Sequence, residues 1–100
     1  QIKLNFGKVS LFPLLAILEF GDEQQQLRNR ELRLLEIFFS SPKILFSKEQ
    51  LTDRLFSISE DITENAIEVY IARIRKKLIG SGLEITTVRG LGYRLTEQNT

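Results

Sequence analysis

The side chains best suited to chemistry in this sequence are six cations that lie close together near its C-terminal end. They are Arg73, Arg75, Lys76, Lys77, Arg89 and Arg94. From residue 62 onward the chain has six Lys and Arg against four Asp and Glu, whereas residues 1–61 have eight against nine. A local excess of positive side chains is what a phosphate-binding surface needs. The C-terminal part is therefore the candidate binding region, although the net charge is only +1.

Other reactive side chains offer little. The sequence has no Cys and no His, which removes thiol nucleophiles, disulfides, the usual zinc ligands and the commonest general base. Asp53, Glu60, Asp61, Glu64 and Glu68 form no pair with an obvious acid or base role, and helix capping or solvation accounts for them. We therefore expect neither an enzyme nor a bound metal or cofactor.

The cations must be positioned by a helix that we expect over Thr63–Leu78. At 100° per residue its aliphatic side chains form one core stripe, made of Ile67, Ile71, Ile74 and Leu78. Thr63 is the expected cap at its start, and Gly80 and Gly82 are expected to end it. Aliphatic and charged side chains therefore belong to different sides of one helix.

The exposed side of this helix has an unusual composition. It carries Asn65, Val69, Ala72, Arg73 and Lys76, with Arg75 on a flank. Small side chains allow close approach to a surface, Asn can read base edges, and Arg can bond guanine or hold a phosphate. Two other interpretations stay open: cations that suit the helix dipole, and a partner protein packed on Val69 and Ala72.

A β-hairpin is predicted next, with strands over Glu84–Val88 and Tyr93–Leu95. The tip is Arg89-Gly-Leu-Gly, a narrow turn that can push Arg89 outward into a groove. The alternative is an ordinary exposed arginine. The two glycines are not a nucleotide-binding loop, because the loop joins two strands and has no G-x-G-x-x-G.

The upstream sequence predicts the rest of one small domain. Expected strands are Ile2–Phe6, Val9–Phe12, Leu15–Phe20 and Gln24–Leu27, with a tight turn at Gly21-Asp22. From Asn29 the pattern becomes helical, with Leu32, Leu35, Ile37, Phe38 and Phe39 as the apolar face and Pro42 as the stop. Ser47 and Gln50 form a capping box that opens a second helix. A polar connector, residues 56–62, leads to the third.

Three helices followed by a hairpin is the order of a winged helix-turn-helix, in which the last helix enters the major groove of DNA. We predict an α+β fold with an N-terminal four-stranded antiparallel sheet, three helices and a C-terminal hairpin wing. No repeat or long linker interrupts the chain, so residues 1–100 are expected to form a single domain.

The segments ENAIEVYIARIRKKL and ITTVRGLGYRL resemble the DNA-binding effector domain of OmpR/PhoB-type response regulators, whose pattern is V-D-V-H-I-x-R-L-R-K-K-L and T-V-R-G-x-G-Y-R-[FL]. Upstream, LRNRELRLLEIFFSSPKILFSKEQLTDRLF is similar to the family's first two helices. The resemblance covers Leu27–Leu95. It implies DNA contact from eight positions: Asn65, Val69, Ala72, Arg73, Arg75, Lys76, Thr87 and Arg89.

Within that set, the resemblance implies base or thymine-methyl contact from Val69 and Arg73, phosphate contact from the other polar positions, and minor-groove insertion of Arg89. Some positions depart from the family pattern. Asn65 and Ala72 stand where Arg is frequent, which predicts fewer phosphate contacts and a weaker salt dependence. Arg28 replaces the family's capping Thr, which leaves Asn29 as the expected cap of the first helix.

The resemblance also implies partners. They are double-stranded DNA with tandem half-sites, a receiver domain that precedes this piece and is phosphorylated on Asp by a sensor histidine kinase, and RNA polymerase through residues 56–62. It implies a bacterial, cytoplasmic protein. The alternative from another class is a winged helix that serves protein interaction alone, with Val69, Ala72 and Leu91 as an apolar docking patch.

Overall fold

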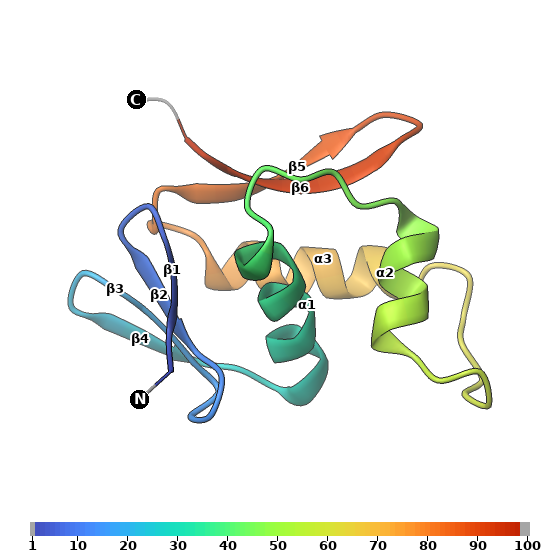
Figure 1. Ribbon diagram of the computed structural model, residues 1–100, viewed down its shortest axis with the longest axis horizontal. Coiled ribbons are helices and arrows are strands. Elements are labelled where there is room, and N and C mark those ends of the chain that lie inside the picture. Colours follow the sequence, from blue (N-terminus) through green and yellow to red (C-terminus); the bar gives the residue numbers. More distant parts are fainter. Residues whose placement is uncertain (1, 99–100) are drawn as a thin grey trace.

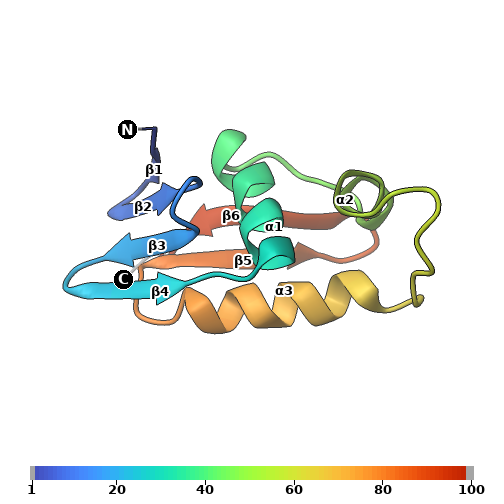
Figure 2. The ribbon, with the colours of Figure 1, turned by 90° about the horizontal axis from the view of Figure 1, so that it is seen from below.

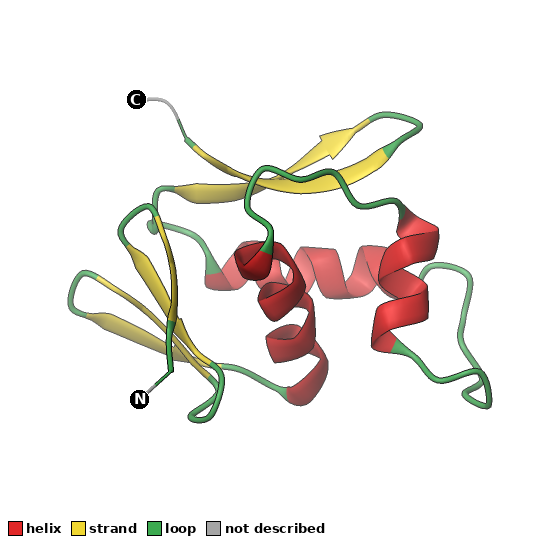
Figure 3. Ribbon diagram, in the orientation of Figure 1, coloured by secondary structure: helices red, strands yellow, loops and turns green. Residues whose placement is uncertain are grey.

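The computed structural model describes residues 2–98, which form a sheet, three helices and a hairpin (Figure 1, Figure 3). The sheet strands are β1 (Leu4–Phe6), β2 (Val9–Phe12), β3 (Ile17–Phe20) and β4 (Glu23–Gln26). The helices are α1 (Asn29–Ser40), α2 (Lys48–Leu55) and α3 (Ala66–Lys77), and the hairpin is β5 (Leu83–Val88) with β6 (Gly92–Glu97). The four sheet strands pair in chain order, each antiparallel to the next. The predicted α+β winged-helix fold is confirmed.

The N-terminal strands match the predicted ones with shifts at their ends. β3 begins two residues later than expected, because the chain turns at Pro13–Ala16, where Ala16 has a φ of 54° and the Leu15 amide donates to the Phe12 carbonyl at 3.1 Å. The turn between β3 and β4 is as predicted, since Gly21 has a φ of 57°, which an L side chain adopts at a cost.

The sheet, the helices and the hairpin share one apolar core. The predicted stripe of α3 is buried along its whole length, at Ile67, Ile71, Ile74 and Leu78. On α1 the prediction was partly wrong. Leu34, which it omitted, is fully buried, whereas Leu32 and Ile37 are only partly buried at the edge of the core.

The helix starts show which caps the sequence identified correctly. The capping box of α2 is confirmed: the Gln50 amide donates to Ser47 Oγ at 3.1 Å, and the Ser47 amide donates to Gln50 Oε1 at 2.8 Å. In α1 the cap residue is Arg28, not Asn29, and Glu31 Oε1 accepts from the Arg28 amide at 2.8 Å. The Glu31 carboxylate, at the third position of the helix, thus satisfies the amide of the cap residue, although the cap side chain is not a typical capping group.

The third helix begins at Ala66, so the expectation that Thr63 caps it was wrong. Asn65 is the cap residue, and its side chain makes no capping hydrogen bond. Thr63 instead accepts the Ala66 amide on its backbone carbonyl at 3.2 Å, which makes a single turn ahead of the helix. Gly80 and Gly82, predicted to end the helix, both have a φ of 84°.

The elements are arranged around α3. In Figure 1 this helix lies behind α1, with the β5–β6 hairpin above it and the β4–α1 connection below it. Figure 2 shows α3 along one edge of the molecule, beside β5. One side of α3 therefore faces solvent, and its two flanks lie against the hairpin and the start of α1. No helix in residues 2–98 is long and apolar enough to cross a membrane.

Candidate nucleic-acid interface

The exposed side of α3 is the side that the sequence predicted. The side chains of Asn65, Val69, Ala72, Arg73 and Lys76 are all exposed. Val69, at 39 % exposure, is a solvent-facing aliphatic residue with no core role. This side combines two small apolar groups, an amide and two cations, a composition that suits a groove lined by bases and phosphates.

Arg75 ties the hairpin to one flank of α3. Its guanidinium donates to the Ile85 carbonyl from Nε at 3.1 Å and from one Nη at 2.8 Å, and the same Nη donates to Thr87 Oγ1 at 2.7 Å. Charge-assisted hydrogen bonds of this kind are stronger than neutral ones. Two predicted site residues, Arg75 and Thr87, therefore contact each other, and together they set the position of the wing relative to the helix.

The hairpin is also fixed at its other strand. Tyr93 and Phe46 exchange backbone hydrogen bonds at 2.8 and 2.9 Å, which joins β6 to the segment before α2. Gly92 lies in this contact, and a Cβ there would meet the Phe46 carbonyl oxygen at 2.0 Å. In the rest of the turn, Arg89 and Leu91 are exposed to solvent. The wing is therefore held along β6 up to the turn, and the Arg89 and Leu91 side chains of the turn are open to solvent.

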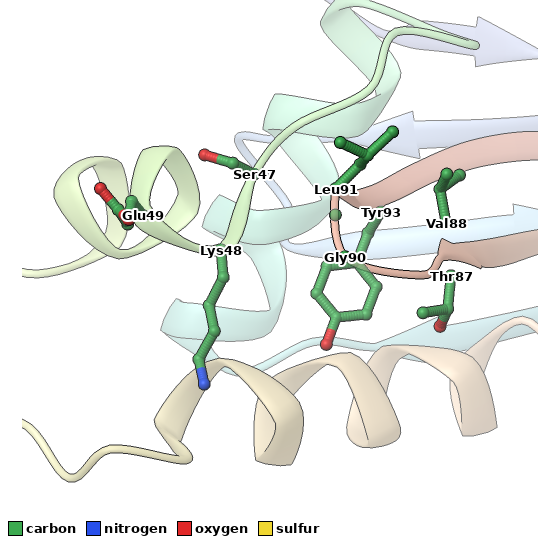
Figure 4. A pocket seen from close by; sticks show the side chains of 9 residues that line it. Ser47, Lys48, Glu49, Thr87, Val88, Gly90, Leu91 and Tyr93 are labelled. Carbon is green, nitrogen blue, oxygen red and sulfur yellow. The ribbon is translucent and has the colours of Figure 1, made fainter.

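Between the wing tip and the start of α2 lies an open hollow of about 330 Å³, shown in Figure 4. Its lining residues are Ser47, Lys48, Glu49, Thr87, Val88, Gly90, Leu91, Gly92 and Tyr93. In Figure 4 the Lys48 side chain extends toward the first turn of α3. Its Nζ lies 3.0 Å from a carboxylate oxygen of Glu68. A cation from α2 thus lies beside the predicted interface.

The contact between Lys48 and Glu68 shifts the pKa values of both side chains. The hydrogen bond to Glu68 raises the pKa of Lys48 above its ordinary 10.5, and the same bond lowers the pKa of Glu68 below its ordinary 4.5. Both side chains are more than two-fifths exposed, so solvent screens the pair. Glu68, in the first turn of α3, balances the charge on Lys48.

The loop between α2 and α3 is fastened by α1. Arg30 donates to the Leu55 carbonyl at 2.7 Å, forms a salt bridge with Glu60, and places its guanidinium 4.4 Å from the centre of the Phe56 ring. Glu60 in turn accepts the Ser57 amide at 2.9 Å. Ile58, at the outer side of this loop, is fully exposed. The loop is thus anchored at its base while it presents an aliphatic side chain to solvent.

Sequence reasoning identified the exposed side of α3 and the wing tip but not their supports. The contacts of Arg75 with Ile85 and of Lys48 with Glu68 join residues that are 10 and 20 positions apart, in different elements, and no local pattern signals them. A capping box did place Lys48 at the start of a helix, which was the only hint. No cluster of His, Cys, Asp and Glu within residues 2–98 could hold a metal ion.

A hairpin fixed beside the third of three helices defines a winged helix-turn-helix domain. The family model "Transcriptional regulatory protein, C terminal" matches residues 22–95 of this chain. The chain therefore belongs to the family of C-terminal effector domains of transcriptional regulators, the OmpR/PhoB type.

Individual relatives agree with this assignment. The transcriptional regulatory protein TctD of Salmonella typhimurium (strain SL1344) is 44 % identical over 102 residues, which cover 94 % of this chain and 46 % of TctD. YxdJ of Bacillus subtilis (strain 168) is 33 % identical, with 96 % and 43 % covered. This chain therefore spans less than half the length of these relatives.

Solved structures show the same fold. The C-terminal domain of the nisin resistance regulator NsrR, described as a lantibiotic response regulator, superposes with a TM-score of 0.80 at 35 % identity, covering 96 % of this chain and 99 % of that one. The Klebsiella pneumoniae RstA DNA-binding domain, solved in complex with RstA box, has a TM-score of 0.80 at 24 % identity, with 96 % and 98 % covered. At that identity the second likeness concerns the fold alone.

Proposed function

We propose that this chain binds double-stranded DNA sequence-specifically as the output domain of a two-component response regulator that controls transcription. The exposed side of α3 enters the major groove, and Arg89 enters the adjacent minor groove. The observation that carries the proposal is the hairpin bound by Arg75 along the flank of a helix whose free side bears Arg73 and Lys76. An α-helix about 10–12 Å wide fits a major groove about 12 Å wide.

Each residue of the interface receives a role from its position. Val69 and Ala72 are small enough to meet thymine methyl groups, and Arg73 can bond a guanine edge. Asn65, at the start of the helix, and Lys76 reach base edges or phosphates. Arg75 and Thr87 hold the wing against the helix in the free protein and meet the backbone from that position.

The test is a fluorescence-anisotropy titration of labelled random-sequence duplex with the chain at two salt concentrations. We expect binding at low salt that weakens steeply as salt rises, because Lys and Arg displace condensed counterions. The double variant Arg73→Ala/Arg89→Ala should lose most of the affinity while its circular dichroism stays native. Arg33→Ala/Lys8→Ala removes the same charge from exposed positions elsewhere and should bind like the parent. Absence of binding by the parent at low salt would overturn the proposal.

The relatives are more than twice as long as this chain. We propose that, in the whole regulator, a receiver domain precedes this chain. Phosphorylation of that domain on Asp by a sensor histidine kinase would pair two copies on tandem half-sites in the bacterial cytoplasm. We assign contact with RNA polymerase to the loop 56–62, supported by exposed Ile58 on a base fastened by Arg30. Ile58→Ala in the whole regulator should lower transcription from its target promoter and leave DNA affinity unchanged.

The competing function is protein docking without DNA. The exposure of Val69 and Leu91 supports it, since both are aliphatic and face solvent. The exposed cations of the same helix side and wing, Arg73, Lys76 and Arg89, argue for DNA, because the cores of protein–protein interfaces are depleted of charge. The same titration separates the two functions, since a docking module would leave the duplex free at low salt.

A further inference from the structure

A second group of cations lies on the flank of α3 that faces away from the wing. Arg28, Arg73 and Lys77 surround an open hollow of about 360 Å³, and Glu31 completes its lining. Arg28 belongs to the connection between β4 and α1, so it is 45 positions from Arg73 and 49 from Lys77 in the chain. Sequence reasoning noted Arg28 only as a departure from the capping Thr of the family.

The geometry of a helix places this group opposite the wing. Arg75 and Lys77 are two residues apart, so at about 100° per residue they point about 160° away from each other around α3. Arg75 binds β5, whereas Lys77 Nζ donates to the Gln26 carbonyl at the end of β4, at 2.9 Å. Figure 1 shows the same arrangement, with the hairpin on one side of α3 and the β4–α1 connection on the other. The groove-facing side of α3 therefore lies between two cationic flanks.

The charges of this flank are incompletely balanced within the protein. Glu31 is the single acid in the lining; it is only 4 % exposed, and it already accepts the Arg28 amide. Lys77 uses one hydrogen bond on Gln26, and Arg73 stacks its guanidinium 5.2 Å from the centre of the Tyr70 ring. Within residues 2–98 the Arg28 guanidinium forms no salt bridge. Three cations near one carboxylate repel one another, and an external polyanion relieves that repulsion.

We propose that Arg28 and Lys77, which lie beside the base-reading Arg73, contact the phosphate backbone along the edge of the major groove opposite the wing. This inference rests on the proposed DNA binding and adds a contact from outside the helix-turn-helix. A helix that fills the groove brings both of its flanks close to a backbone strand, because its width nearly equals that of the groove. The wing contacts one DNA strand, and the Arg28 flank contacts the other.

Arg28→Gln tests the contact. Binding of labelled random-sequence duplex is measured by anisotropy over a series of salt concentrations for the parent chain, Arg28→Gln and the matched control Arg33→Gln. Arg33 is an exposed arginine of α1, so its replacement removes the same charge away from the flank. We expect the slope of log K against log salt to decrease in magnitude by about 0.9 for Arg28→Gln, the loss of one phosphate contact, and to stay at the parent value for Arg33→Gln.

A second variant separates binding from folding. Arg28→Thr provides a hydroxyl at the cap position of α1, so its melting temperature should equal or exceed that of the parent. Its salt slope should nevertheless fall as in Arg28→Gln. An unchanged slope in both Arg28 variants, or an equal fall in Arg33→Gln, would overturn this inference and leave the proposed function intact. A parent chain that does not bind duplex at all would overturn the proposed function itself.

Discussion

The guanidinium of Arg75 and the hydroxyl of Thr87 form a 2.7 Å hydrogen bond that joins the third helix to the wing. Both residues belong to the set predicted to contact DNA, and in the free domain they contact each other. The same guanidinium also donates to the Ile85 carbonyl, so one side chain of the helix binds the wing at two acceptors. Pre-orienting two binding elements in this way reduces the ordering cost that binding would otherwise carry.

The first prediction concerns this joint. Thr87→Val keeps the shape of the side chain and removes the hydroxyl, and we expect a loss of about 1 kcal/mol in stability because a hydrogen bond to a charged group is lost at a partly exposed site. Amide hydrogen exchange in β5 and β6 should accelerate, because the wing is less firmly held. Exchange measured by mass spectrometry without DNA checks this directly.

Thr87→Ser is the matched control for the joint, since it keeps the hydroxyl and should keep the slow exchange of the parent. Lys76→Gln removes an exposed cation from the free side of α3 and should leave the exchange of the hairpin unaltered. Equal exchange rates in Thr87→Val and the parent would mean that the hydrogen bond between Arg75 and Thr87 does not hold the wing.

The second prediction concerns the contact between the wing and the segment before α2. Gly92 has a φ of 145°, and a Cβ there would meet the Phe46 carbonyl oxygen at 2.0 Å. Gly92→Ala should therefore destabilise the domain by about 3 kcal/mol or more, because both the backbone and the β6 contact must shift. Thermal unfolding followed by circular dichroism measures the effect.

Gly90→Ala gives the comparison, because Gly90 has a φ of 78° but nothing within 4 Å of an added Cβ. Only the conformational cost applies there, about 1–2 kcal/mol. A Gly92 variant as stable as the Gly90 variant would contradict the close backbone contact.

The third prediction concerns pH. The Ser57 amide, and after it Arg30, hold the pKa of Glu60 below its ordinary value of 4.5. The folded state therefore favours the ionised carboxylate. Its contribution to stability is complete above about pH 4.5 and is lost as pH falls through the lowered pKa. A ¹³C titration of the Glu60 carboxyl should show the depressed pKa.

Arg30→Met should move the Glu60 pKa only part of the way back, because the Ser57 amide is the larger cause. It should also loosen residues 56–62, since the contacts with Leu55 and Phe56 disappear with the guanidinium. A Glu60 pKa in the parent at or above 4.5 would refute the anchoring of this loop.

The fourth prediction concerns Lys48, which Glu68 neutralises beside the interface. Glu68→Gln removes that balance, so the pKa of Lys48 should fall back toward 10.5 and the cation should become available to phosphates. We expect tighter binding of random duplex at low salt and little change in stability, because the pair is largely exposed. Glu23→Gln on β4 removes an equal charge away from the Lys48–Glu68 pair, and an equal gain in affinity there would assign the effect to net charge alone.

Much of the fold could be predicted because its signals are local. The stripe Ile67, Ile71, Ile74 and Leu78 repeats with the helical period, and burial followed from that repeat. The box of Ser47 and Gln50 and the turn at Gly21 depend on neighbours within three residues, so they too were predicted correctly. Thr63 was a false start because a suitable cap residue precedes many turns that do not open a helix.

The sequence by itself determined which side of α3 is buried, which side is free, and that a hairpin with an arginine at its tip follows. Only the tertiary structure decided what each cation does: Arg75 holds the wing, Lys77 binds the Gln26 carbonyl, and Arg28 joins Arg73 on the opposite flank. The physical reason is the distance along the chain over which each signal acts. Periodicity reports burial one turn at a time, whereas a long flexible cation chooses its partner among groups that only the folded chain brings within reach.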